Sequence, residues 1–258
     1  MNNDYTTVKK LYYGSDLVNI AVGGTEAQVP SALTTWSVNE WGNPTSIVVK
    51  EGETSIPNGW QRYNEILSAC TLPNTITSIG RGAFNYVSTQ TDGLIINLPS
   101  SLTVIGSTAF QNAKIGCDIT IPSGAIANGT SAVTTPTCES AFQGTDFTNH
   151  IVTIEEGATI IPYHMFISAK NVTIIVPSTV TFLSPKCFQV GYSANITVKF
   201  LGSTPPDASS WTYSSGNCPF YSSNSDYFNN LTILVPSSKV TAYKNKFGTL
   251  IGARVQGY

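Results

Sequence analysis

Short runs of β-branched and other aliphatic residues recur along the chain, separated by stretches rich in Asn, Ser, Thr and Gly. Two of them, residues 172–176 and 231–235, follow an asparagine and end directly before a proline. Runs of this length and composition are typical of β-strands. Proline cannot donate a hydrogen bond to a sheet, so it marks the point where the strand ends. Similar runs predict strands at residues 94–96, 119–121, 151–154 and 196–198.

A longer pattern repeats around these predicted strands. In five segments a Pro, or Glu155 in one copy, follows an aliphatic residue and precedes a Phe by eleven positions. A sixth copy, residues 121–142, carries an insertion of about nine residues, and a degenerate first copy runs from Val48 to Trp60. The five regular copies are residues 72–84, 98–110, 154–166, 176–188 and 235–247.

One such unit is too small to bury its own apolar side. Stacking the copies solves this problem, because each strand then pairs with the same strand of the next copy. Each Phe joins a continuous interior column in that arrangement. The repeat therefore predicts a β-rich solenoid with a ladder of parallel strands.

The residues that carry the repeat also resemble a known family. The segment 72–84, Leu-Pro-Asn-Thr-Ile-Thr-Ser-Ile-Gly-Arg-Gly-Ala-Phe, is similar to the BspA-type leucine-rich repeat. This family occurs in bacterial surface antigens and in related proteins of gut microbes, their phages and some protists. The resemblance covers roughly residues 47–248 and implies a right-handed leucine-rich-repeat solenoid. It implies adhesion or protein binding without a shared active site.

The first 46 residues do not fit the repeat. Residues 8–14 and 17–24 have the alternation and the Gly-containing connection of a β-hairpin. We expect residues 1–46 to form a small N-terminal β cap or an attachment segment. Residues 47–258 would then form the solenoid with its C-terminal cap.

Composition excludes several classes of partner. Charged residues are 11% of the chain, against about 25% in a typical soluble protein. With Lys and Arg totalling 13 and no basic cluster, a nucleic-acid partner is not expected. No apolar stretch approaches the roughly 20 residues that span a bilayer, so membrane insertion is not expected either. The N-terminus also lacks the pattern of a secretory signal.

The five cysteines, at positions 70, 117, 138, 187 and 218, are widely spaced. No Cys-x-x-Cys occurs, which argues against a zinc ribbon or a redox motif. We interpret the cysteines as small buried apolar residues, with one disulfide as the open alternative.

Catalytic patterns are weak. His150 and His164 are the only histidines, and we expect both on the solvated surface. Gly80-Arg81-Gly82 begins like a dinucleotide-binding loop, but Asn85 stands where its third glycine would be. We interpret these glycines as turn residues.

The densest carboxylates are Glu51 with Glu53 and Glu155 with Glu156. Both pairs come directly after a predicted strand, so a repeated turn explains them better than a glycosidase pair. We therefore expect no enzyme, no cofactor and no metal site.

An irregular stretch, residues 204–230, contains the best candidates for ligand contact. Aromatic residues lie there among Ser, Asn and Gly, a composition that suits recognition of protein or sugar. The alternative is that these rings close the end of the core, which we favour. The insertion at 123–136 is a second expected surface excursion. The ligand-binding candidates are Trp211, Tyr213, Tyr221 and Tyr227.

These observations favour a non-catalytic adhesion module that presents a rigid repeat surface to protein or glycan ligands at a cell surface. The alternative is a structural component of a phage virion, such as a head or tail appendage docked through residues 1–46. In that case an oligomer would be expected. A surface-like composition in a sequence that begins with Met1 and shows no secretory signal motivates the alternative.

Overall fold

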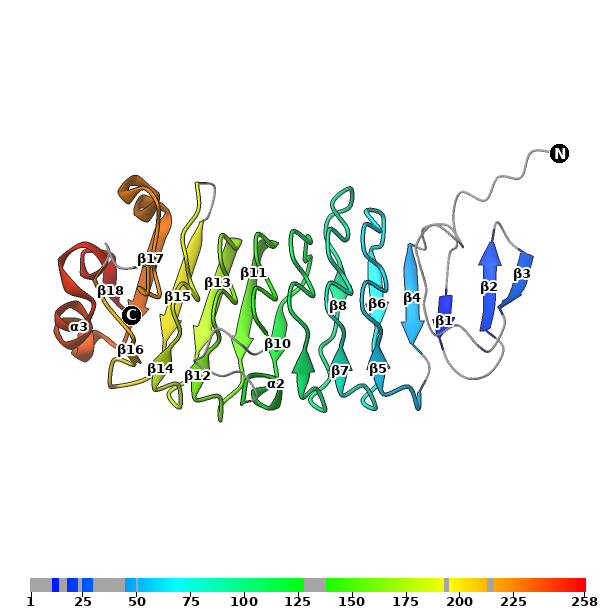
Figure 1. Cartoon of the computed structure of the whole chain (residues 1–258), viewed down its shortest axis with the longest axis horizontal. Helices are drawn as coiled ribbons and strands as arrows, with labels where there is room; N and C mark the ends of the chain where they lie inside the picture. The colour runs from blue at the N-terminus through cyan, green and yellow to red at the C-terminus, as the bar shows by residue number, and fades with distance from the viewer. Residues whose placement is uncertain are drawn as a thin grey trace.

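The protein forms an elongated row of short parallel strands, with a small helix at its C-terminal end (Figure 1). The sheets that the described residues form do not close into a barrel. The predicted stacking of repeats into a solenoid is confirmed at this level. The structure is a computed structural model, which describes residues 11–13, 18–22, 25–29, 45–49, 51–127, 138–192, 195–212 and 216–258.

The longer strands of the repeats form the long ladder, which is divided into two sheets. Neighbouring strands in both sheets are parallel. The N-terminal sheet contains, in order, β1 (Leu11–Tyr13), β4 (Ser46–Val49), β6 (Ala69–Thr71) and β8 (Ile95–Ile96). The C-terminal sheet contains β10 (Ile119–Ile121), β11 (Asp146–Ile154), β13 (Lys170–Val176), β15 (Ile196–Phe200), β17 (Leu231–Val235) and β18 (Val255–Gly257).

A second ladder consists of two-residue strands that follow the longer ones. In five of these strands the second residue is buried while the first is more exposed. Both ladders contribute to a single apolar core. The short strands are β5 (Ser55–Ile56), β7 (Ser78–Ile79), β9 (Val104–Ile105), β12 (Ile160–Ile161), β14 (Phe182–Leu183) and β16 (Asp207–Ala208).

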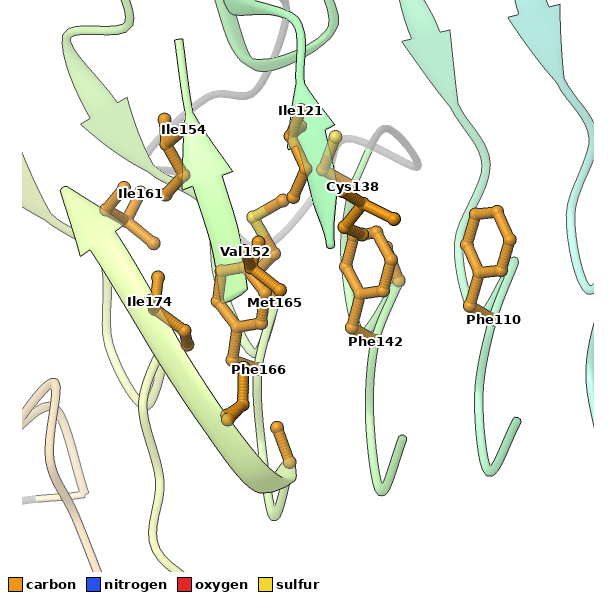
Figure 2. Packing of buried hydrophobic residues seen from close by; sticks show 14 of the residues in the cluster. Phe110, Ile121, Cys138, Phe142, Val152, Ile154, Ile161, Met165, Phe166 and Ile174 are labelled. Atoms are coloured by element: carbon orange, nitrogen blue, oxygen red, sulfur yellow. The ribbon is translucent and has the colours of Figure 1, made fainter. Parts of the chain in front are cut away.

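A column of stacked phenylalanine rings runs through this core, as the repeat predicted. Consecutive ring centroids lie between 5.1 and 5.8 Å apart. Figure 2 shows Phe110, Phe142 and Phe166 in this column. Burying one such side chain contributes roughly 1.5–3 kcal/mol, so the column is a large part of the stability. Its members are Phe84, Phe110, Phe142, Phe166, Phe188 and Phe220.

The segment 235–247 is not a further repeat, and that prediction was wrong. After β17 the chain forms the 3₁₀ helix η2 (Ser237–Lys239) and helix α3 (Val240–Gly252). The spacing between Pro236 and Phe247 also fits about three turns of α-helix. Tyr243 and Phe247 lie one helical turn apart and are both buried; Gly248 (φ 75°, ψ 178°) then kinks the helix, and Ile251 beyond the kink is buried as well. Phe247 therefore packs on the end of the core, with its ring 5.7 Å from that of Phe220.

The last place in the column belongs to Phe220, from the stretch expected to be irregular. That stretch contains β16 and a 3₁₀ helix, η1 (Ser225–Asn230). The repeat is hard to recognise in this stretch because the number of residues between the strand and Phe220 differs from that in the other copies.

The insertion at 123–136, which was expected to be a surface loop, begins with a helix. Residues 123–127 form the short helix α2 (Ser123–Ala127), whose Ala125 and Ile126 are buried. The remainder of the insertion lies outside the described residues.

The N-terminal hairpin forms one strand later than predicted. Strands β2 (Val18–Val22) and β3 (Thr25–Val29) pair antiparallel, while β1 pairs parallel with β4 and joins the long ladder. The predicted pairing of 8–14 with 17–24 is therefore wrong. Gly23-Gly24, between β2 and β3, is a sequence that favours two-residue hairpin connections.

Candidate ligand-binding groove

The outward face of the long ladder carries the side chains that strand alternation keeps out of the core. In β13, Val172, Ile174 and Val176 are buried, whereas Thr173 and Ile175 are half-buried. Because the strands pair in register, outward residues of successive copies form columns that cross the strands. Side chains far apart in sequence are brought together in this way.

Two neighbouring columns are each formed largely by one residue type; the first also includes Ile151 of β11, the register partner of Thr173. The first contains threonines that are register partners in β13, β15 and β17, namely Thr173, Thr197 and Thr232. The second contains asparagines that lie two residues before these threonines, or at the equivalent place in β11. Its members are Asn149, Asn171, Asn195 and Asn230.

These two columns line a shallow groove of ≈ 250 Å³ across the starts of β11, β13, β15 and β17. Asn229 also lines it, with Val172 and Ile196 beneath. No charged side chain is among its lining residues. We call it the Asn–Thr groove.

Hydrogen bonds to the scaffold hold several of the amides in place. Asn171 Nδ2 donates to Asp146 Oδ1 at 2.9 Å, and Asn230 Nδ2 donates to the carbonyl oxygen of Tyr192 at 3.2 Å. Asn229 Oδ1 accepts from Arg254 Nη2 at 2.9 Å. The groove therefore presents polar groups whose positions are set before any ligand arrives.

Backbone conformation explains only some of the asparagines. Asn149 has φ 70° and Asn171 has φ 51°, in the left-handed region that Asn tolerates better than most residues. Asn230, the last residue of η1, does not have positive φ. Asn195 is exposed. Backbone conformation alone therefore does not explain why all four positions of the column are asparagine.

Two tyrosines adjoin the groove. The side chain of Tyr192 is 79% exposed, and its ring meets that of Tyr227 edge-to-face at a centroid distance of 5.7 Å. The bond from Asn230 to the Tyr192 carbonyl connects this pair to the groove. Tyr227 was among the sequence candidates. Tyr192 was missed because it lies outside the aromatic-rich stretch.

The other sequence candidates lie elsewhere. Trp211 is half-buried, with its ring 4.4 Å from that of Phe247, so it packs on the end of the core. Tyr221 is half-buried beneath Lys186, whose Nζ lies 5.1 Å from the ring centroid. Tyr213 lies outside the described residues. The groove asparagines were missed as a set, although an Asn directly before each of the strands at 172–176, 196–198 and 231–235 is visible in the sequence.

The two histidines lie in different environments. His150 is partly exposed, with Nδ1 3.1 Å from Asp118 Oδ1. The backbone N–H of Ile151, followed by His150, lowers the pKa of Asp118. His164 is half-buried and stacks on Tyr163 at 3.6 Å, so it is less solvated than predicted. Burial lowers the pKa of His164 to about 4, and Lys186 contributes to the shift.

The carboxylates after β11 connect successive turns. Glu155 Oε2 accepts from the backbone N–H of Ser123 at 2.8 Å and from its hydroxyl at 3.0 Å. Glu156 Oε1 accepts from the Ser178 hydroxyl at 2.7 Å. These contacts support the interpretation of Glu155 and Glu156 as turn residues.

The cysteines are all unpaired, and four of them are buried. Burial raises the pKa of Cys138 to about 12 and that of Cys218 to about 11. Within the part of the chain that the structure describes, no three His, Cys, Asp or Glu side chains cluster as metal ligands would. None of the helices described there is long and apolar enough to cross a membrane.

Comparison with known proteins supports the repeat assignment. The model of the BspA type leucine rich repeat region matches six copies over residues 54–196. Comparison with curated proteins gives no match. The six copies cover more than half of the chain, and their strands form the parallel ladders described above. The chain therefore belongs to the BspA-type leucine-rich repeat family.

Proposed function

We propose that the chain is a non-catalytic binding module that holds a glycan in the Asn–Thr groove at a cell surface. The observation that carries this proposal is the alignment of an asparagine column and a threonine column in one uncharged groove. A protein ligand on the same rigid face is the broader form of the proposal.

The chemistry of the groove suits a neutral saccharide. Amides and hydroxyls both donate and accept hydrogen bonds, as sugar hydroxyls do. The exposed ring of Tyr192 adds an apolar face beside them. The regular spacing of the columns offers the same contacts at each strand, so an extended oligosaccharide could repeat its contacts from one repeat to the next.

The family supports the location. BspA-type repeats are typical of surface proteins, and we propose an extracellular or cell-surface location for this chain. We also propose that residues 1–46 cap the solenoid or attach it, with residues 47–258 as the repeat domain. The pairing of β1 with β4 supports the cap. The right-handed coiling of the solenoid, which the family resemblance implies, stays a prediction.

Binding to an array of immobilised oligosaccharides and extracellular-matrix proteins tests the proposal. We expect neutral oligosaccharides to bind, and calorimetry with the best of them would give the affinity. Asn195→Ala and Thr197→Val each remove polar groups from the groove and should weaken binding about tenfold, equivalent to about 1.4 kcal/mol. Thr71→Val, on β6 of the other sheet, is the matched control and should bind normally.

Two results would contradict the proposal. One is an array with no signal above background. The other is an affinity that the groove variants and Thr71→Val reduce equally, with unchanged melting temperatures.

A further inference from the structure

Five successive turns, those that carry Trp60, Phe84, Phe110, Phe142 and Phe166, each contain two residues in the left-handed conformation, four positions apart, whereas the turn of Phe188 has only Lys186 in that conformation. The second position of this pair is equivalent in successive copies. The backbone N–H groups of Tyr63, Tyr86 and Asn112 all donate to a carbonyl of the next turn. The pairs are Gly59 and Tyr63, Gly82 and Tyr86, Thr108 and Asn112, Ser140 and Gly144, and His164 and Ser168.

The residues found at the second left-handed position in the different repeats show what the fold requires there. Three copies have Asn112, Gly144 or Ser168 there, which are small residues. Tyr63 and Tyr86 have φ values of 65° and 55°. Such a conformation costs a bulky residue roughly 1–2 kcal/mol. The fold therefore does not need an aromatic side chain at this position, and it is strained by two of them.

Core packing does not compensate for this strain. The side chains of Tyr63 and Tyr86 are 51% and 39% exposed. Their ring centroids lie 5.4 Å apart at an interplanar angle of 33°. The guanidinium of Arg62 lies 4.7 Å from the Tyr63 ring centroid, and its Nη2 donates to the Tyr63 hydroxyl at 2.9 Å. The three side chains form an ordered, solvent-facing cluster.

The chemistry of the cluster indicates its partner. Exposed tyrosine and arginine side chains that are already ordered dominate the energy of protein–protein contacts. No ion pair engages Arg62 in the described residues, and its planar fork of donors matches a carboxylate. A sugar ring that stacked on Tyr63 would compete with the contacts of Arg62 and Tyr86. A protein side chain reaches the same hydroxyls and guanidinium without that competition.

We infer that Arg62, Tyr63 and Tyr86 form a protein-docking surface that binds an Asp or Glu side chain of a partner. This surface is independent of the proposed glycan site. It lies on the turns after β5 and β7, in the N-terminal half of the row, whereas the Asn–Thr groove crosses β11 to β17 in the other half (Figure 1).

The copies supply the variant for the test. Tyr63→Asn/Tyr86→Asn places at both positions the residue found at 112. We expect the variant to melt at the same or a higher temperature than the parent, because Asn tolerates the left-handed conformation. Peptides selected from a random displayed library on the full chain, after depletion on this variant, should contain Asp or Glu. Calorimetry should then show at least tenfold weaker binding when Arg62→Met is introduced, or when the acid of the peptide is changed to its amide.

Tyr258→Asn, which removes an exposed tyrosine at the C-terminal end of the row, outside both surfaces, is the control and should bind the peptides normally. The inference is overturned if the double variant unfolds, if no acidic peptide is selected, or if Arg62→Met binds as well as the parent. An acidic oligosaccharide that binds through Arg62 while peptides do not would also overturn it. None of these results bears on the Asn–Thr groove.

Discussion

Individual residues in this protein can be compared with their equivalents in neighbouring repeats, which separates what the fold needs from what it tolerates. At the column position six successive turns have Phe, from Phe84 to Phe220, because a buried ring must contact the rings above and below it. At the first left-handed position the residues vary from Gly59 to His164. Variation at an equivalent position therefore indicates a role outside the core.

His164 gives a prediction at this scale. Its pKa is near 6.5 in the unfolded chain and about 4 in the folded protein. Between these values the unfolded state binds a proton that the folded state excludes, so stability falls as the pH is lowered from about 6.5 to about 4. The loss attributable to His164 should be on the order of 1 kcal/mol, because the side chain is only half-buried.

The measurement is the free energy of unfolding at pH 7.5 and pH 5, for the parent and for His164→Ser. Serine is the residue at the equivalent position 140 and does not titrate in this range. The difference between the two proteins should shrink or reverse at pH 5. Parallel pH profiles would refute the assignment.

Single elements of the repeat are too short to be stable alone, and contacts between equivalent turns hold them. Backbone packing between turns is especially close at Gly80, Gly93 and Gly106, and Gly80 and Gly106 occupy equivalent places in successive repeats. A Cβ on Gly106 would lie 2.5 Å from the backbone nitrogen of Arg81, and one on Gly80 would lie 2.5 Å from that of Asn58. Gly80, interpreted from the sequence as a turn residue, and Gly106 are needed because the preceding turn leaves no space for a side chain.

Gly106→Ala should therefore destabilise the protein by roughly 1–3 kcal/mol, because two backbone segments must separate. Gly216→Ala is the control, since its Cβ would meet only Lys186 Cε at 3.9 Å. The control should change stability by less than about 0.5 kcal/mol. Chemical denaturation measures both, and equal effects would contradict the packing argument.

The molecule as a whole has few charges and two surfaces of different chemistry. The Asn–Thr groove is lined by uncharged side chains, while the docking surface includes Arg62. Salt shortens the range of charge interactions, from about 10 Å at 0.1 M to about 3 Å at 1 M. Hydrogen bonds between neutral groups are little affected.

Raising NaCl from about 0.1 M to about 1 M should leave glycan binding in the groove within twofold. The same change should weaken the binding of acidic peptides at Arg62 by severalfold. Titrations of both ligands on one preparation provide the comparison. A groove ligand that is released by salt would show that its recognition is ionic, contrary to the proposed chemistry.

The sequence by itself determined the repeat, the positions of most strands of the long ladder and the phenylalanine column, but not the short strands of the second ladder. These follow from local patterns, because a β-branched run, a proline and a Phe at fixed distances specify one unit whichever copy carries them. The same reasoning failed at residues 235–247, where the spacing fits a helix as well, and at Phe220, where the spacing is irregular. It also placed the hairpin one strand too early.

Only the tertiary structure decided which outward residues meet. Asn171 and Asn195 are separated by a full repeat, and so are Tyr63 and Tyr86. Whether such residues become neighbours depends on the register of parallel strands across repeats of unequal length. Exposure is decided in the same way, since the ring of Trp211 is covered by Phe247 while Tyr192 is left in solvent. A surface site is a property of the assembled array, because each repeat contributes only one side chain to each column.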